Sequence, residues 1–300
     1  MTDKDQFETI DDGLLVRAPA KINLSLLIAG KRPDGFHELE TIMAKVNWYD
    51  EILIQQGRNA GIELICNGPE WAPEGEENLV HKAAKLFMDT CGKWADIKIT
   101  LTKNIPAGSG LGSASSDAAA TLMGLNKYSD LQLPNSALAK LAAQLGSDVA
   151  FFLDGPLAFC TGKGEKIEKL DENFNFLARL FLPDVSASTK KGYANYKHNP
   201  DLYEKLHTQI NDLLSKNRVD LVTKMCANML EMSCFSLHKE LADLKAKIES
   251  SVSRPLCLSG SGSAMFYIID NGDIEKGRAN QNILEKQTGC KSVIVNNNKW

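Results

Sequence analysis

The sequence lacks long apolar runs, basic segments and the residue spacings of common metal sites. No apolar run approaches the roughly 18 residues that a membrane-spanning helix needs, and the first residues, MTDKDQFETIDDG, are acidic rather than signal-like. The net charge of -4, without any Lys/Arg run interleaved with aromatic residues, argues against nucleic acid as the main partner. We therefore expect no membrane and no nucleic-acid partner, and a cytoplasmic protein or its plastid or bacterial equivalent.

Cysteine and histidine are present, but not in the spacings that bind metals. The seven cysteines are scattered, odd in number and never form a CxxC pair, and the five histidines form no HExxH motif. This pattern predicts reduced, mostly buried thiols and argues against a structural zinc site.

The overall composition is that of an ordinary globular protein. Hydrophobic residues make up 43% and charged residues 24% of the 300 residues. A chain of this length typically forms two domains or one large one. The composition shifts around PLAFCTGKGEKIEKLDENF, which predicts a hairpin at a domain boundary. We expect domains at residues 1–165 and 166–300.

The most informative segment is a Gly- and Ser-rich loop that runs into an alanine-rich stretch, KNIPAGSGLGSASSDAAATL, at residues 103–122. Gly108, Gly110 and Gly112 allow backbone angles and close approaches that a Cβ would block, so successive N–H groups can converge on one anion. The helix expected from about residue 115 adds unpaired N–H groups and a dipole that favour a polyphosphate. Hydroxyls for capping, phosphate or a metal ion come from Ser113, Ser115 and Ser116.

This loop matches neither of the common phosphate-binding motifs. A Walker loop needs Lys followed by Ser or Thr after the last glycine, whereas Ser113 and Ala114 follow Gly112. A second candidate, GPLAFCTGKGE, has Leu157 at the first glycine and Gly164 at the Ser or Thr. The dinucleotide fingerprint GxGxxG would need glycine at position 113. A flexible linker is the alternative, but such linkers are seldom fused to an apolar helix.

Periodic patterns place this loop between a strand and a helix. Strands are predicted at 16–30, 42–56, 61–67 and 96–106, and helices at 78–91, from about 115, and from Asn135 or Ser136 to about Gly146. In the second half we expect a strand at 178–185, a helical stretch at 217–250 and a strand, glycine loop and strand at 254–270.

Three motifs in this order resemble those of the GHMP kinase superfamily: PAKINL at 19–24, IPAGSGLGSASSDAA at 105–119 and LSGSGSAMF at 258–266. The resemblance covers nearly the whole chain. It implies an α+β class with a two-domain GHMP kinase fold, an N-terminal domain like ribosomal protein S5 domain 2 and a ferredoxin-like C-terminal domain.

A narrower resemblance concerns the substrate. Within the superfamily, DGFHELET, GSDVAFFL and GKGEKI are similar to the branch that phosphorylates the 2-hydroxyl of a cytidine-diphosphate-linked methylerythritol in the non-mevalonate isoprenoid precursor pathway. Two alternatives are another GHMP small-molecule kinase, acting on homoserine, mevalonate or a sugar, and a catalytically silent nucleotide-binding sensor. The partner implied is a small cytidyl-polyol substrate, and we expect a monomer or weak homodimer.

The resemblance implies ATP and Mg²⁺ as cofactors. The ATP-binding residues that it implies are Pro106, Ala107, Gly108, Ser109, Gly110, Leu111, Gly112, Ser113, Ala114, Ser115 and Ser116, with Asn78 and Lys103 at the adenine and ribose end. Ser116 or Asp117 would contribute to a magnesium site, although Mg²⁺ usually keeps several waters and binds the phosphates themselves. The metal ligands stay open.

Phosphoryl transfer requires an aligned hydroxyl, a clamped triphosphate and neutralising cations. By resemblance, Lys21 and Asp148 are the catalytic pair. Asp148 would accept the proton of the substrate hydroxyl, and Lys21 would hold the carboxylate and stabilise the developing alkoxide. A neighbouring ammonium group makes a carboxylate a poorer base, so orientation of the hydroxyl can matter more than proton removal.

The substrate residues implied by the resemblance include Asp148 and a group around the DGFHELET segment. Asn23 lies two residues after Lys21, hence on the same strand face. Phe36 stands where Tyr is common in the family, so it keeps ring stacking without the hydroxyl. His37 would stack on the cytosine or hydrogen-bond to it.

The remaining substrate residues implied by the resemblance come from the second half of the chain. Tyr193 or Tyr196 would form the other side of a cytidine sandwich, with Lys190 and Lys191 near a diphosphate. The glycines that would let the backbone approach the substrate phosphates or brace the first loop are Gly260 and Gly262.

Overall fold

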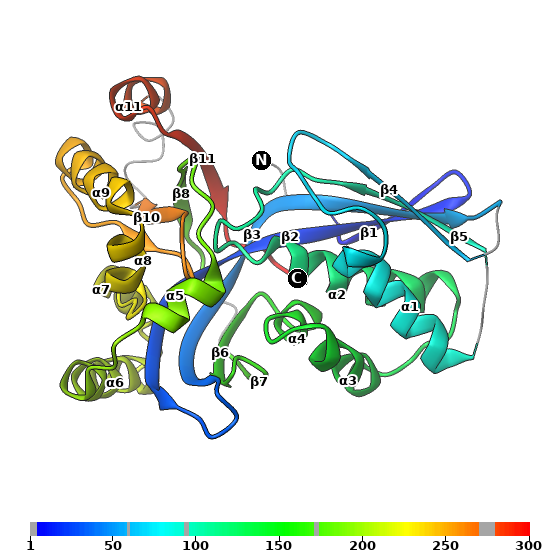
Figure 1. Cartoon of the computed structure of the whole chain (residues 1–300), viewed down its shortest axis with the longest axis horizontal. Coiled ribbons are helices and arrows are strands. Elements are labelled where there is room, and N and C mark those ends of the chain that lie inside the picture. The colour runs from blue at the N-terminus through cyan, green and yellow to red at the C-terminus, as the bar shows by residue number, and fades with distance from the viewer. Residues whose placement is uncertain (1–4, 59–60, 93–95, 171–173, 270–279) are drawn as a thin grey trace.

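The computed structural model describes residues 5–58, 61–92, 96–170, 174–269 and 280–300. Its described part contains two β-sheets, one of seven strands and one of four. Figure 1 shows the smaller sheet and helices α6 to α9 at the end of the molecule opposite β4, β5 and α1. The molecule thus consists of two lobes, each with its own sheet.

The first sheet is built around a long antiparallel hairpin. Its strands are β1 (Phe7–Ile10), β2 (Gly13–Lys31), β3 (His37–Gln56), β4 (Ile62–Asn67), β5 (Ile97–Thr102), β6 (Leu157–Gly162) and β7 (Lys166–Lys169). The order is β1-β2-β3-β5-β4. Strand β6 pairs with the N-terminal part of β3, and β7 pairs with β6. Register shifts between Pro19 and Ala20 and between Asn23 and Ser25 bend β2 where the first motif lies.

Helices cover one face of this sheet (Figure 1). They are η1 (Gly75–Glu77), α1 (Leu79–Cys91), α2 (Ser113–Tyr128), α3 (Asn135–Leu145) and α4 (Val149–Leu153). Helix α2 packs closely on the hairpin because Gly124 has no side chain: a Cβ there would lie 2.6 Å from Ile54 Cδ1 and 2.8 Å from Val16 Cγ2. This close packing fixes the helix that follows the glycine loop.

The second sheet is antiparallel. Its strands are β8 (Leu177–Leu182), β9 (Cys257–Leu258), β10 (Met265–Ile269) and β11 (Lys291–Asn296), in the order β11-β8-β10-β9. The helices are α5 (Thr189–Asn195), α6 (Pro200–Ser215), α7 (Val219–Met225), α8 (Glu231–Leu237), α9 (Lys239–Val252) and α11 (Gln281–Thr288). A strand, helices, two strands, a helix and a strand in this order form the ferredoxin-like arrangement.

The two sheets share an apolar core. Ile22 and Ile42 of the long hairpin belong to the same buried cluster as Leu180 and Phe266 of the second sheet. The predicted boundary at residues 165/166 falls inside the β6–β7 hairpin, where Thr161 pairs with Lys166. We propose that the chain divides after β7 instead.

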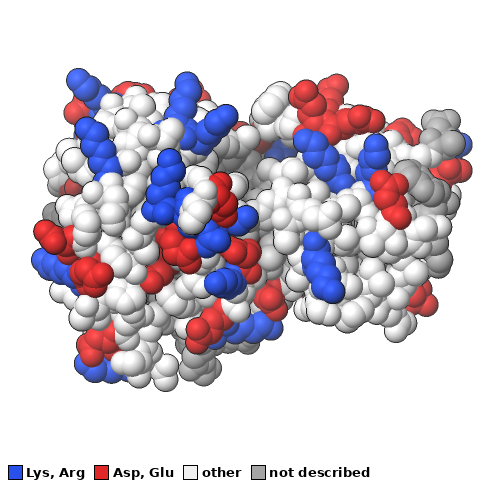
Figure 2. Space-filling view, turned by 60° about the horizontal axis from the view of Figure 1, so that its bottom comes forward, with Lys and Arg blue, Asp and Glu red and all other residues white. Residues whose placement is uncertain are grey.

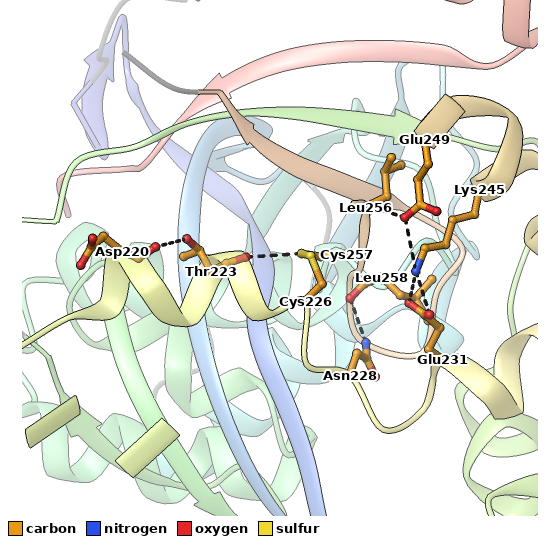
Figure 3. Close-up of a disulfide and its surroundings, with 10 residues drawn as sticks. All are labelled: Asp220, Thr223, Cys226, Asn228, Glu231, Lys245, Glu249, Leu256, Cys257 and Leu258. Atoms are coloured by element: carbon orange, nitrogen blue, oxygen red, sulfur yellow. Dashed lines mark hydrogen bonds and ion pairs between the residues drawn. A yellow bond between two sulfur atoms is a disulfide. The ribbon is translucent and has the colours of Figure 1, made fainter. Parts of the chain in front are cut away.

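The stretch at 217–250 is helical as expected, but it is divided into α7, α8 and α9 rather than forming one continuous helix. Cys226 ends α7 with a left-handed φ of 47° and forms a disulfide with Cys257 at the start of β9 (Figure 3). After it, the Asn228 amide donates hydrogen bonds of 2.8 Å to the carbonyls of Leu258 and Gly260. The expectation of reduced thiols is therefore wrong for this pair, whereas Cys66, Cys91, Cys160, Cys234 and Cys290 are free. Contacts distant in sequence end the helix here.

Among the described residues, no helix has the length and apolar character to cross a membrane.

Candidate functional site

A cleft of about 1150 Å³ brings the three sequence motifs together. Its walls come from β2, the turn before β3, the glycine loop, the start of α4, α5 and the loop after β9. The space-filling view shows two lobes joined by a narrower middle, with positive and negative side chains intermixed on this face (Figure 2). Nearly every residue that we predicted as a ligand or catalytic group lines this cleft. The exceptions are Ser116, Lys191 and Gly262.

Lys21 lies at the bottom of the cleft and is only 3% exposed. Its ammonium group donates hydrogen bonds to Asn23 Oδ1 at 2.6 Å and to the Gly110 carbonyl at 2.7 Å. Asn23 is held in turn, because its amide donates to Thr41 Oγ1 at 2.8 Å. Burial lowers the pKa of Lys21, and the carboxylate of Asp148 opposes that shift. The ammonium is therefore fixed and desolvated.

Glycines allow the three motifs to touch. A Cβ on Gly112 would lie 2.9 Å from Lys21 Cγ, and a Cβ on Gly110 would lie 2.1 Å from the Ser259 carbonyl. A Cβ on Gly260 would lie 3.2 Å from Lys21 Nζ. Gly110, Gly112 and Gly260 all have positive φ, at 77°, 72° and 57°. A side chain at Gly112 or Gly260 would push against Lys21, and one at Gly110 would push the glycine loop away from Ser259.

Backbone hydrogen bonds join the same segments. The Lys21 N–H donates to the Leu111 carbonyl at 2.9 Å, and the Ala264 N–H donates to the Ser109 carbonyl at 2.9 Å. Helix α2 begins at Ser113, two residues earlier than expected. The N–H groups of its first turn lack partners within the helix, and Ala114 and Ser115 line the cleft at this point. The glycine loop thus presents an anion site to the cleft.

Lys103 holds the end of the glycine loop in place through contacts at the start of α2. Its buried ammonium forms ion pairs with Asp50 and with Asp117 Oδ2, the latter at 2.6 Å, and donates to Ser113 Oγ. Burial opposes its charge, but the carboxylates of Asp117 and Asp50 outweigh burial and raise the pKa of Lys103. All three N–H donors therefore have protein partners. This geometry supports a bracing role rather than the predicted contact with adenine or ribose.

Asn78 likewise has a local role. Its Oδ1 accepts a hydrogen bond from the Val80 N–H at 2.9 Å, which caps α1, and its amide donates to the Pro73 carbonyl at 2.7 Å. The side chain lines the cleft, but its hydrogen-bonding groups hold the helix and the preceding loop.

Two buried oxygens near the loop have no hydrogen-bond partner in the described structure: Ser116 Oγ and Asp117 Oδ1. Burial first, and then the neighbouring Asp50 carboxylate, raise the pKa of Asp117 well above its ordinary value. The described residues contain no group of three or more His, Cys, Asp and Glu side chains that could hold a metal ion by themselves.

Asp148 lines the cleft and lies directly before α4. Its side chain is partly exposed. None of the ion pairs between described residues joins it to Lys21, whose ammonium contacts Asn23 and Gly110 instead. The predicted hold of Lys21 on this carboxylate is therefore not a direct contact, although the two groups act on one another through their charges.

Aromatic rings line the outer end of the cleft. His37 stacks on Tyr193 with centroids 5.3 Å apart and meets the edge of Tyr196 at 5.8 Å. A base between two rings needs their planes about 7 Å apart, so a sandwich between His37 and Tyr193 is not available in this arrangement. Phe36 is 54% exposed, and the Lys163 ammonium lies over its ring, 4.7 Å from the ring centroid, in a cation–π contact.

Among the cleft residues that the sequence interpretation did not single out, two have side chains suited to binding a ligand, Trp71 and Lys163. Trp71 is 71% exposed and lines the end near Asn78. Lys163 lines the opposite end, beside Phe36. A tryptophan in a loop rich in Gly, Pro and Glu was a usable signal for Trp71, because a ring in such a loop is not committed to a core and can stack on a ligand. Nothing local in the sequence distinguishes Lys163 from other surface lysines.

Comparisons with known proteins agree with this geometry. Residues 78–156 match the family model of the GHMP kinases N terminal domain. The chain is 39% identical over 274 residues to 4-diphosphocytidyl-2-C-methyl-D-erythritol kinase of Chloroherpeton thalassium, covering 91% of this chain and 94% of that protein. It is 36% identical over 256 residues to the Bacillus cereus protein of the same name, covering 85% and 88%.

Solved structures are similar over nearly the whole chain. A 4-(cytidine 5'-diphospho)-2C-methyl-D-erythritol kinase matches with a TM-score of 0.74 at 29% identity, covering 95% of this chain and 100% of that one. A homoserine kinase from Cytophaga hutchinsonii matches with a TM-score of 0.73 at 19% identity, covering 99% and 98%. The second match shows the shared fold only.

Proposed function

Because the chain belongs to the 4-diphosphocytidyl-2-C-methyl-D-erythritol kinase family of GHMP kinases, we propose that it transfers the γ-phosphoryl group of ATP to the 2-hydroxyl of 4-diphosphocytidyl-2-C-methyl-D-erythritol. This reaction belongs to the non-mevalonate route to isoprenoid precursors. The observation that carries the proposal is the convergence of an anion-binding loop, a buried lysine and a carboxylate in one cleft.

The loop and α2 would hold the triphosphate. Glycine backbone and the first-turn N–H groups at Ala114 and Ser115 favour a polyphosphate without any Walker lysine. Lys21 points from the base of the cleft toward this loop, because its ammonium is bound to the Gly110 carbonyl. A fixed cation there stabilises negative charge that develops during transfer.

Asp148 would receive or orient the acceptor hydroxyl. It is partly exposed and lines the same cleft as the glycine loop. Because its contact with Lys21 is electrostatic rather than direct, the carboxylate keeps free lone pairs for a substrate hydroxyl. An aligned hydroxyl accounts for much of the catalysis in phosphoryl transfer.

The residues below the loop fit Mg²⁺. Ser116 Oγ and Asp117 Oδ1 are hard oxygen donors that lack partners in the described structure. Ser116, Asp117 or both would hold the ion together with the phosphates, and the ion would neutralise charge on the transferring group. A bound cation would also favour the ionised form of Asp117.

The aromatic end of the cleft suits a pyrimidine nucleotide. Phe36 is 54% exposed although Lys163 lies over its ring, and His37 and Tyr193 form a stacked pair beside it. Burial, Lys31 and His198 lower the pKa of His37, which keeps the imidazole neutral and able to exchange hydrogen bonds with a neutral base. Lys163 and Lys190, which line the same region, would attract the diphosphate.

The opposite end would take the adenine of ATP. Trp71 and Leu79 line it, and the Trp71 ring is mostly exposed. A large open ring can stack on a base without sequence-specific hydrogen bonds. We place the adenine here instead of assigning it to the amide of Asn78 or the ammonium of Lys103, which already have protein partners.

A panel of acceptor alcohols with γ-labelled ATP tests this function. We expect label on 4-diphosphocytidyl-2-C-methyl-D-erythritol and little or none on mevalonate, homoserine or galactose. Transfer to one of those three but not to the cytidyl substrate would overturn the substrate assignment. ATP binding without transfer to any acceptor would favour the nucleotide-binding sensor. Cytoplasmic action as a monomer or weak homodimer stays a prediction, which cell fractionation and size-exclusion chromatography check.

A further inference from the structure

A second buried lysine lies next to Lys21. Lys45 is only 1% exposed, and its Cα pairs with that of Lys21 across the β2–β3 hairpin. Directly opposed residues of an antiparallel pair project to the same face. The salt bridges between described residues leave Lys45 without a carboxylate partner at ion-pair distance. Two lysines are therefore buried side by side, and only one of them reaches the cleft.

The ammonium of Lys45 contacts the end of a short helix. It donates to the Phe152 carbonyl at 3.1 Å and to the Asp154 carbonyl, both at the C-terminus of α4. The last carbonyls of a helix lack partners within it and carry partial negative charge, which suits a cationic donor. A helix of five residues is too short to be stable alone. Lys45 thus supplies an anchor that α4 needs.

Helix α4 lies near both members of the proposed catalytic pair. Asp148 immediately precedes its first residue. Near its other end, the Phe152 ring and the stem of Lys21 flank the same point of the glycine loop, since a Cβ on Gly112 would be 2.9 Å from both Phe152 Cζ and Lys21 Cγ. A shift of α4 would therefore move the carboxylate and also move the Phe152 ring that faces the glycine loop beside Lys21.

We infer that Lys45 is a positioning residue: by anchoring the C-terminus of α4 it sets the distance between Asp148 and Lys21. The inference rests on the proposed roles of those two residues. Lys45 does not line the cleft and would not touch either substrate. Its effect on phosphoryl transfer would pass through the helix.

A purely structural role explains this lysine poorly. Burial lowers the pKa of Lys45 to about 7, with Asp154 opposing and Lys169 adding to the shift. The folded protein therefore binds the proton less readily than the unfolded chain, whose lysines have an ordinary pKa near 10.5. The free energy of unfolding therefore rises with pH between about 7 and 10.5. Below about pH 7 the full energetic cost of burying the charged Lys45 is present. An apolar side chain would avoid that cost but could not hold the two carbonyls.

The groups that face Lys45 come from three elements. Lys21 lies opposite on β2, Asp148 and Asp154 flank α4, and Lys169 on β7 forms a 3.1 Å ion pair with Asp154. Lys169 provides the matched control, because its side chain is 60% exposed and lies near the same helix end. Replacing it removes a charge near α4 without removing the anchor.

The test compares Lys45→Met, Lys45→Gln and Lys169→Met in the full chain. Met keeps the volume but has no donor, whereas Gln keeps an N–H donor without charge. We expect Lys45→Met to lower kcat about tenfold to a hundredfold, with the KM for ATP within about twofold and the Tm unchanged or higher. Lys45→Gln should recover part of kcat, and Lys169→Met should match the unaltered protein.

Amide hydrogen exchange of α4 gives a readout that does not depend on the substrate. Faster exchange at residues 149–154 in Lys45→Met, with the rest of the protein unchanged, would support the anchor even if no acceptor alcohol were phosphorylated. Full kcat in Lys45→Met, or kcat falling only in step with Tm, would overturn the inference. If Lys45→Met does not fold, Lys45→Gln decides: unchanged kcat and unchanged exchange overturn it, and lowered kcat with faster exchange at α4 supports it.

Discussion

Replacement of Lys103 by methionine tests how the glycine loop is held in place. Lys103 is 3% exposed, and its carboxylate partners Asp50 and Asp117 are 0% and 4% exposed. Removing one partner of a buried ion pair leaves the others uncompensated, which costs about 3 to 5 kcal/mol. With about 2.1 cal/mol/K of unfolding entropy per residue over 300 residues, the Tm should fall by roughly 5 to 8 °C.

The destabilisation caused by Lys103→Met should increase as pH rises. The pKa of Asp117 is raised in the folded protein by burial and by Asp50. A raised pKa means that folding favours the protonated carboxyl, so this group's contribution is present below its ordinary pKa and is lost as pH rises through the folded value. Without the Lys103 ammonium the folded value rises further. The destabilisation should therefore be larger at about pH 8 than at about pH 5.

Thermal and urea unfolding measure this loss directly. Lys216→Met is the control, because Lys216 and Asp212 form an ion pair whose side chains are 61% and 56% exposed, and such pairs contribute at most about 1 kcal/mol. Asp117→Asn in the Lys103→Met background should restore part of the stability. A Lys103→Met protein that unfolds within 1 °C of the unaltered one at both pH values would refute the buried cluster as the support of the loop.

Three further predictions concern the cleft. Asp148→Ala should abolish phosphoryl transfer while leaving ATP affinity nearly intact in calorimetry; near-full turnover would show that the base or orienting group lies elsewhere. Gly110→Ala should weaken ATP binding and stability together, because its Cβ would lie 2.1 Å from the Ser259 carbonyl; unchanged affinity would contradict the tight contact between motifs. Phe36→Ala should raise the KM for the cytidyl substrate about tenfold, as base stacking is worth about 1 to 3 kcal/mol, with the KM for ATP unchanged, whereas Lys163→Met should raise the former KM less. An effect of Phe36→Ala on ATP alone would exclude a cytosine contact.

Local patterns predicted most elements closely. The helix expected at 78–91 is α1 at Leu79–Cys91, with Asn78 as its cap, and the strand expected at 16–30 lies within β2. Alternation and capping depend on neighbours within a few residues, so they can be recognised in the sequence. The α+β class and the superfamily are confirmed by the structure and the relatives. The proposed roles of single residues stay predictions.

Long-range contacts account for what the local patterns did not show. The helical stretch expected at 217–250 is broken at Cys226, because that residue bonds to Cys257, and Asn228 then binds the backbone of the third motif. For Lys103, which lies between a strand and the glycine loop, the family resemblance implied a nucleotide ligand. Its partner Asp50 lies 53 positions away, so no local pattern indicates that the ammonium is already engaged.

The sequence by itself determined the three motifs, their order and the need for glycine within them, since backbone conformation and helix dipoles are local properties of the chain. Only the tertiary structure decided which charges meet. It placed Asn23 and the Gly110 carbonyl on Lys21, surrounded Lys103 with carboxylates, and put Lys45 under α4. Such partnerships depend on burial between distant segments, and a buried charge acquires its role from the groups that the fold brings to it.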